Sequence, residues 1–115
     1  MMLRRLVIAL MVFSLASSAN ATTVIFKNYK AHQNEDLYKA YLDGMREGLI
    51  AQNEEMALAG QQRRFCLPRN LALTVEQADG IIMHEAAKMN DPDRLPISVI
   101  LINGLKDTFP CDEKH

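Results

Sequence analysis

The 115-residue sequence has no tryptophan, few aromatic residues and no excess of charge of either sign. Three tyrosines and four phenylalanines are too few for the stacking platforms with which proteins bind single-stranded nucleic acid. Thirteen basic residues stand against fourteen acidic ones, without a basic run, which also argues against a nucleic-acid partner. We therefore expect no nucleic acid among the partners.

No apolar run is long enough to cross a bilayer. The run at residues 6–15 is about half the length of ~20 residues that a spanning helix needs. It follows Arg4 and Arg5 and precedes small residues that end at Ala21, the order of a cleavable signal peptide. A membrane anchor is the alternative. We predict a signal peptide at residues 1–21, a single helical domain at residues 22–115, a periplasmic location and no membrane contact after cleavage.

The patterns that carry most enzyme chemistry are also missing. The sequence has no Gly-x-Ser-x-Gly, no Gly-rich phosphate loop and no dinucleotide fingerprint. The three histidines have no His-x-x-x-His or cysteine companion, which argues against a metal site. His84 and Glu85 would point about 100° apart on a helix and make a poor acid–base pair. We expect no catalysis, no cofactor and no metal.

Three segments have the three- and four-residue apolar spacing of amphipathic helices. The first begins at Asn34, an expected cap, and ends before Gly60. The second opens with a capping box at Thr74. The third begins near Pro96 and is so widely apolar that it is either central to a bundle or covered by another chain. These signals predict an all-α fold, a small three- to four-helix bundle.

Two other stretches carry weaker signals. Residues 22–33 are expected to form an arm across the helices and a solvated loop, with a short strand paired to residues 71–73 as the alternative. A seam of small residues also follows one edge of the first helix, at Ala40, Gly44, Gly48 and Ala51. Glycine costs about 1 kcal/mol in a helix relative to alanine, so we expect another helix of the same core to approach this seam closely. A ligand-binding groove is the alternative.

Cys66 and Cys111 are the only cysteines, and each lies at a helix boundary beside a phenylalanine. In an exported chain such a pair favours a disulfide, and the 44 intervening residues exclude a Cys-x-x-Cys redox motif. Closing a loop of this length destabilises the unfolded chain by about 4 kcal/mol in the chain-entropy model. We predict a structural bridge; a free reactive thiol is the alternative.

The loop at residues 61–70 contains Arg63, Arg64 and Arg69. Three arginines in seven residues can form an anion site, although such a group is more often a solvated rim.

The order of these signals resembles the Rap/Tai-type immunity proteins associated with type VI secretion. The residues that carry the resemblance are Tyr41-Leu42-x-Gly44-x-x-x-Gly48-Leu49, Gly60, Phe65-Cys66-x-Pro68, Leu73-Thr74-x-x-Gln77, Leu95-Pro96 and Leu105-x-x-x-Phe109-Pro110-Cys111. Many such proteins carry an extra cysteine pair nearer the start, which residues 26–39 lack.

The resemblance implies a small helical periplasmic protein, often dimeric, that binds and blocks a peptidoglycan-cleaving amidase effector. The three loop arginines would then contact the effector, and a homodimer would also cover the apolar third helix. Two alternatives remain: an acid-stress chaperone of the HdeA type and an envelope protein with a structural or assembly role.

Overall fold

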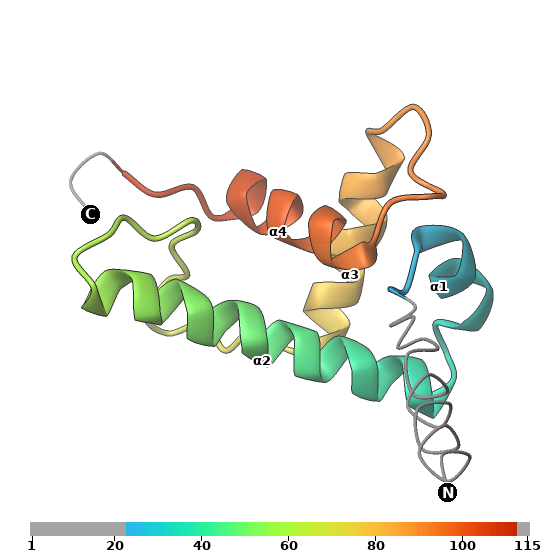
Figure 1. The fold of residues 1–115 in the computed structure, drawn as a ribbon, viewed down its shortest axis with the longest axis horizontal. Coiled ribbons are helices and arrows are strands. Elements are labelled where there is room, and N and C mark those ends of the chain that lie inside the picture. Colours follow the sequence, from blue (N-terminus) through green and yellow to red (C-terminus); the bar gives the residue numbers. More distant parts are fainter. Residues whose placement is uncertain (1–22, 113–115) are drawn as a thin grey trace, which may run out of the picture.

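A computed structural model describes residues 23–112 of the chain (Figure 1). This part folds into four helices: α1 (Phe26–His32), α2 (Asp36–Leu58), α3 (Val75–Ala87) and α4 (Ile97–Thr108). In Figure 1, α2 and α4 extend in a similar direction, while α3 crosses them and packs against both. The predicted all-α bundle is confirmed. The predicted signal peptide, residues 1–21, lies outside the described residues.

The core is built around α4, whose inward side chains Ile97, Ile100, Leu101 and Leu105 are fully buried. Each such side chain contributes about 1.5 to 3 kcal/mol by leaving water. Of the two alternatives for this helix, the structure shows the first: α4 is central to the bundle. Of its large apolar side chains only Val99 is exposed, so the rest of the chain already covers α4. The apolar surface of α4 is therefore no argument for a second chain that covers this helix.

Other elements complete the same core with side chains from every helix and from the loop between α2 and α3. They are Phe26, Tyr29, Leu42, Phe65, Leu73, Ala78, Ile82 and Ala86. Gly104 sets the distance between α3 and α4. A Cβ added there would lie 2.5 Å from Ile81 Cγ2, closer than packed carbon atoms approach. The absence of a side chain at Gly104 lets the two helices cross in close contact.

The N-terminal segment differs from the prediction of an arm and a loop. Residues 26–32 form the helix α1, and the backbone before it pairs with the segment that precedes α4. The Phe26 N–H donates to the Leu95 carbonyl at 2.9 Å, and the Ile97 N–H donates to Val24 at 3.0 Å. The alternative pairing with residues 71–73 is also wrong. These tertiary hydrogen bonds hold α1, since a seven-residue helix is too short to be stable alone.

Tyr29 joins α1 to α3. Its ring is buried and its hydroxyl donates a short hydrogen bond to the Asp79 carboxylate. Burial, and then the hydrogen bond and charge of Asp79, raise the pKa of Tyr29 well above its ordinary value. The phenol therefore stays protonated and keeps its role as donor.

The small-residue seam of α2 is exposed, contrary to the prediction that another helix of the core approaches it. Ala40, Gly44, Gly48 and Ala51 all lie on the open side of the helix. An added Cβ at either glycine would meet no heavy atom within 4 Å. The core instead packs against a different side of α2, the one that carries Leu42.

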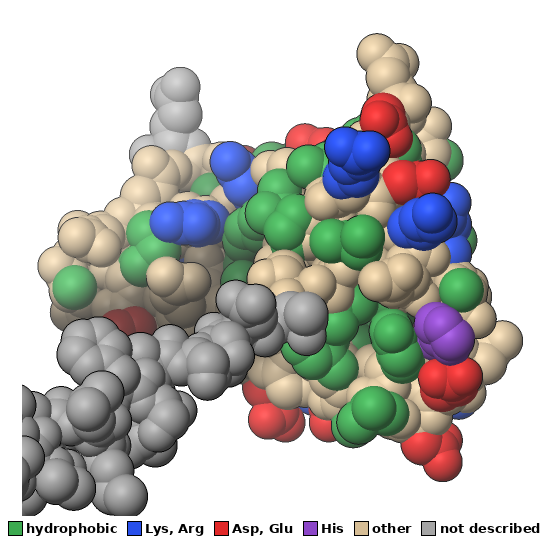
Figure 2. Space-filling view, turned by 45° about the vertical axis from the view of Figure 1, so that its right-hand side comes forward, with side chains coloured by type: hydrophobic (Ala, Val, Ile, Leu, Met, Phe, Trp, Pro, Cys, Tyr) green, Lys and Arg blue, Asp and Glu red, His purple; other side chains and the backbone are tan. Residues whose placement is uncertain are grey.

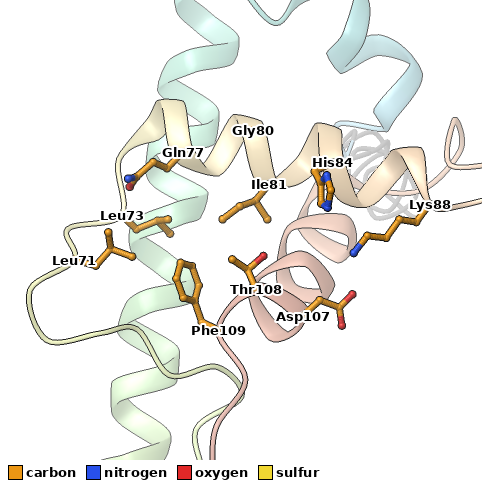
Figure 3. Close-up of a pocket in the computed structure, with 10 residues that line it drawn as sticks. All are labelled: Leu71, Leu73, Gln77, Gly80, Ile81, His84, Lys88, Asp107, Thr108 and Phe109. Atoms are coloured by element: carbon orange, nitrogen blue, oxygen red, sulfur yellow. The ribbon is translucent and has the colours of Figure 1, made fainter.

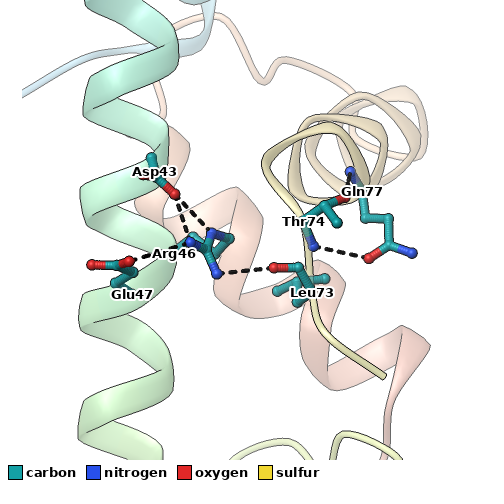
Figure 4. Close-up of polar contacts among 6 residues, drawn as sticks. All are labelled: Asp43, Arg46, Glu47, Leu73, Thr74 and Gln77. Atoms are coloured by element: carbon teal, nitrogen blue, oxygen red, sulfur yellow. Dashed lines mark hydrogen bonds and ion pairs between the residues drawn. The ribbon is translucent and has the colours of Figure 1, made fainter. Parts of the chain in front are cut away.

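The helix boundaries follow local chemistry. The capping box of α3 is confirmed, because the Gln77 N–H donates to Thr74 Oγ1 at 3.1 Å and the Thr74 N–H donates to Gln77 Oε1 at 2.9 Å (Figure 4). The predicted cap at Asn34 is wrong, since α2 begins after Glu35 without a side-chain cap. Gly60 ends α2 as predicted, with φ of 76°, a conformation that glycine adopts without strain.

One partly buried arginine fastens α2 to the start of α3. Arg46 Nη1 donates to the Leu73 carbonyl at 2.9 Å, and Arg46 Nη2 pairs with Asp43 at 2.6 Å (Figure 4). The Arg46 side chain is only 18% exposed. It therefore satisfies a backbone carbonyl that the α2–α3 connection would otherwise leave unpaired.

Candidate functional site

The arginine loop, residues 61–70, is the candidate site. It leaves α2 through a pair of backbone hydrogen bonds typical of a helix C-terminus with glycine: the Gly60 N–H donates to Ala57 and the Gln61 N–H donates to Met56, at 3.1 and 2.8 Å. The turn at Gly60 reverses the chain so that the loop runs back along the last turns of α2. This reversal brings loop residues beside helix residues about ten positions earlier.

Asn53 of α2 clamps the returning loop. Its Nδ2 donates to the Phe65 carbonyl at 2.9 Å, and its Oδ1 accepts from the Arg64 N–H at 2.8 Å. Asn53 is 5% exposed and Phe65 is fully buried, so these polar groups have little access to water. A single amide side chain therefore fixes the backbone of the loop where its arginines begin.

The disulfide holds the same loop from the other side. Cys66 and Cys111 are bonded, as predicted, with their Cα atoms 5.0 Å apart. Beside the bridge, the Cys66 N–H donates to the Phe109 carbonyl at 2.8 Å. The loop is thus attached to α2 by Asn53 and to the end of α4 by a covalent bond and a backbone hydrogen bond. These contacts fix the backbone of the loop at residues 64–66.

The three predicted arginines have different surroundings. Arg63 forms a two-pronged ion pair with Glu54, with distances of 3.1 Å from Nε to Oε1 and 3.0 Å from Nη2 to Oε2. The hydrogen bond from Arg63 lowers the pKa of Glu54, and Glu54 raises the pKa of Arg63. Arg64 and Arg69 are exposed and form no side-chain hydrogen bond or ion pair within residues 23–112.

A cavity of about 340 Å³ lies under the loop and brings two of the three arginines together. Arg63 and Arg69 line it, whereas Arg64 does not. Ile50, Phe65 and Leu67 supply apolar surface to the same cavity. A carboxylate on an apolar stem fits this combination, because a guanidinium binds a carboxylate with paired hydrogen bonds. The cavity therefore combines the charged and apolar groups that binding of an acidic side chain requires.

Among the described residues, no group of three His, Cys, Asp or Glu side chains is arranged to hold a metal ion. None of the helices in this part of the chain is long and apolar enough to cross a membrane.

Sequence reasoning found the arginines and the disulfide but missed Asn53. An asparagine among polar helix residues normally points to solvent, and only the returning loop buries this one. The sequence carried only a weak signal for this role. Gly60, which ends the helix, comes seven residues after Asn53, and it is followed by a loop that contains the apolar residue Phe65.

Comparison with known protein families decides what kind of molecule carries this loop. The model of the Rap1a immunity proteins matches residues 17–111, which is most of the chain. The chain belongs to the Rap1a immunity protein family. The matched region of this Rap1a protein includes all four helices, both cysteines and the arginine loop. Searches of curated proteins and of solved structures found no match.

Family membership confirms the resemblance at the level of immunity proteins and the expectation of a binding protein in place of an enzyme. An immunity protein acts by binding a cognate effector. For this Rap1a protein, the arginine loop is accordingly a candidate contact surface.

Proposed function

We propose that this Rap1a protein is periplasmic and neutralises a peptidoglycan-cleaving amidase effector of a type VI secretion system by occupying its cleft. The observation that carries the proposal is the arginine loop, held at Asn53 and at Cys66 and presenting two arginines whose side chains have no ion pair within the described part of the chain. A segment already ordered loses little conformational entropy on binding, so more of its contact energy appears as affinity. Family membership supports this function over the acid-stress chaperone and the envelope assembly protein.

Arg64 and Arg69 are proposed as the principal contacts and Arg63 as a lesser one. Arg63 must break its ion pair with Glu54 before it binds a partner carboxylate, whereas the other two have no such pair to lose. We therefore expect replacement of Arg64 or Arg69 by alanine to weaken effector binding more than Arg63→Ala does.

The test is to express the neighbouring amidase in the periplasm with and without the Rap1a protein, and to capture the tagged protein from the same cells. The proposal expects survival together with a stoichiometric complex. It expects the Arg63, Arg64 and Arg69 triple alanine variant to lose both. Survival without a complex would reject occlusion.

A matched control removes three positive charges outside the loop. It replaces three exposed basic residues by alanine: Lys27, Lys39 and Arg94. This variant is expected to bind and protect as the unmodified protein does. Equal loss from both triple variants would show that net charge, and not the arginine loop, governs the interaction.

The proposed location rests on the predicted signal peptide. Protein recovered from the periplasm is expected to begin at Thr22 and to weigh two hydrogens less than the reduced chain. An intact mass that retains residues 1–21, or free thiols after alkylation, would contradict this part of the proposal.

We further propose a homodimer formed by α2. Its exposed face carries Leu37 at 77% and Leu58 at 84% exposure, near opposite ends of the helix, with Gly44 and Gly48 between them. Figure 2 shows apolar side chains at the surface on the face that includes α1 and the start of α2. Residues 37 and 58 lie ten and eleven positions from the middle residue of α2, Glu47, so two antiparallel copies would place each Leu37 near the partner's Leu58. Such an arrangement is self-complementary, as a two-fold interface requires.

Light scattering tests the dimer, with a mass twice that of the mature chain expected at micromolar concentration. Gly48→Glu would place two like charges at the centre of the interface and is expected to give a monomer. Gly80→Glu, at an exposed glycine of α3, is the matched control and should remain dimeric. A monomeric unmodified protein would reject the proposal.

A further inference from the structure

A second recess lies on the face of α3 that meets the end of α4. It is a groove of about 610 Å³ between α3, the end of α4 and the segment at residues 71–73 (Figure 3). Volumes of this size are typical of sites that hold a small ligand or a short stretch of peptide. Leu71, Leu73, Ile81 and Phe109 provide its apolar part.

Gly80 keeps one wall of this groove open. The residue is exposed, has no positive φ, and an added Cβ would meet nothing within 4 Å. It therefore differs from Gly104, whose missing side chain is required by the contact between α3 and α4. Glycine in a helix costs about 1 kcal/mol relative to alanine, and the described chain offers no internal packing reason for that cost at Gly80. Room for an occupant of the groove is such a reason.

The two ends of the groove differ in polarity. Figure 3 shows Leu71, Leu73 and Phe109 gathered at one end, and Lys88 and Asp107 at the other. Lys88 Nζ lies 3.4 Å from Glu85 Oε2, so its charge already has an acidic partner. Asp107 is exposed and forms no ion pair among residues 23–112. Asp107 is therefore the acidic group of the groove that is open to a basic ligand, beside Lys88 and His84, which line the same groove.

We propose that this groove binds an extended segment of the effector in which an aliphatic side chain lies next to a basic one. The aliphatic side chain packs on the floor formed by Ile81 and Phe109, and the basic side chain pairs with Asp107. The inference rests on the proposed function, because it takes the effector as the source of the segment. It adds a contact surface separate from the arginine loop and of opposite charge preference.

Peptide probes test the groove without the effector. Amide NMR spectra are recorded while the protein is titrated with N-acetyl-Gly-Leu-Arg-Gly-amide, and then with the corresponding Leu-Glu and Ala-Arg peptides. We expect millimolar binding of the Leu-Arg peptide, with shifts at Gly80, Ile81 and Phe109. The Leu-Glu and Ala-Arg peptides should bind at least about fivefold more weakly, since one meets Asp107 with like charge and the other leaves the apolar floor empty.

Two variants remove one half of the groove each. Gly80→Leu fills the open wall and should abolish peptide binding; because leucine favours helix over glycine, its melting temperature should equal or exceed that of the unmodified protein. Asp107→Asn should bind the Leu-Arg and Leu-Glu peptides alike. Asn28→Leu and Asp91→Asn are the matched controls, since both residues are exposed outside the groove, and both should keep the fivefold preference.

Capture of the amidase with Gly80→Leu identifies the source of the segment. The inference expects at least tenfold weaker association than for the unmodified protein. Undiminished association, equal binding of the Leu-Arg and Leu-Glu peptides, or shifts outside the groove would each overturn it. Failure of the unmodified protein to capture the amidase would reject the proposed function, and with it the effector as occupant. The peptide titration would then still decide whether the groove prefers aliphatic–basic segments.

Discussion

Replacing Asn53 by alanine should release the arginine loop from α2 while the core stays intact. The change removes the donor to the Phe65 carbonyl and the acceptor of the Arg64 N–H, at 2.9 and 2.8 Å. Phe65 is fully buried, so its carbonyl cannot recover the lost bond from water without local opening. A buried backbone group left unpaired costs about 1 to 3 kcal/mol. The Phe65 carbonyl and the Arg64 N–H both lose their partner, and Arg64 is exposed. We therefore expect Asn53→Ala to destabilise the protein by about 2 to 4 kcal/mol.

Thermal unfolding of the oxidised protein, followed by circular dichroism, measures this loss. In a domain of this size each kcal/mol lowers the melting temperature by about 4 to 8 °C, so a drop of roughly 10 to 25 °C is expected. Gln52→Ala is the control, because Gln52 is exposed on the adjacent position of the same helix; it should change stability by less than about 0.5 kcal/mol. A melting temperature of Asn53→Ala within 2 °C of the control would refute the clamp.

Three further outcomes follow from other contacts. Cys66→Ser should lower the free energy of unfolding by up to about 4 kcal/mol while far-ultraviolet circular dichroism at low temperature stays helical; loss of the helical signal would contradict a bridge that acts mainly on the unfolded chain. Tyr29→Phe should make stability less dependent on pH in alkali. Because the folded state raises the pKa of Tyr29, the unfolded chain loses the phenol proton first as pH rises above about 10, and the free energy of unfolding of the unmodified protein falls. Unfolding measured over this pH range should show a smaller fall in the variant. Gly104→Ala should cost about 1 to 3 kcal/mol in denaturant unfolding, because its Cβ meets α3, whereas Gly80→Ala should be neutral or slightly stabilising; equal effects would exclude the close crossing of α3 and α4.

The parts of the fold that the sequence predicted correctly are those with local signals. The capping box at Thr74, the helix end at Gly60 and the wide apolar surface of α4 each depend on residues close together in the chain. The disulfide was also predictable, because a chain with two cysteines has one possible intramolecular pair, and the predicted export favours its oxidation.

The features that were missed depend on contacts between distant residues. The helix α1 has no apolar periodicity of its own and is held by hydrogen bonds to residues 93–95. Asn53 is buried only because Gly60 reverses the chain above it. The small-residue seam was located correctly on one edge of α2, but periodicity tells which residues share a face and not what lies opposite that face.

The same limit applies to the candidate site. Sequence reasoning grouped the three arginines by their nearness in the chain, and the structure separates them by partner and position. Arg63 is paired with Glu54. Arg69 lines the same cavity as Arg63, whereas Arg64 does not line this cavity. The groove beside Gly80 had no signal in the sequence, because its walls come from three segments that the chain brings together only on folding.

The attachment of the arginine loop separates the residues that stabilise the loop from the residues that are exposed for binding. The atoms that hold the loop belong to the Asn53 amide, a disulfide and the backbone, whereas the side chains of Arg64 and Arg69 form no hydrogen bond or ion pair within residues 23–112. Residues at these two exposed positions can therefore be exchanged with little cost in stability. Under the proposed function, a lineage that meets a new toxin could change what the loop recognises by single substitutions, without rebuilding the scaffold that presents it.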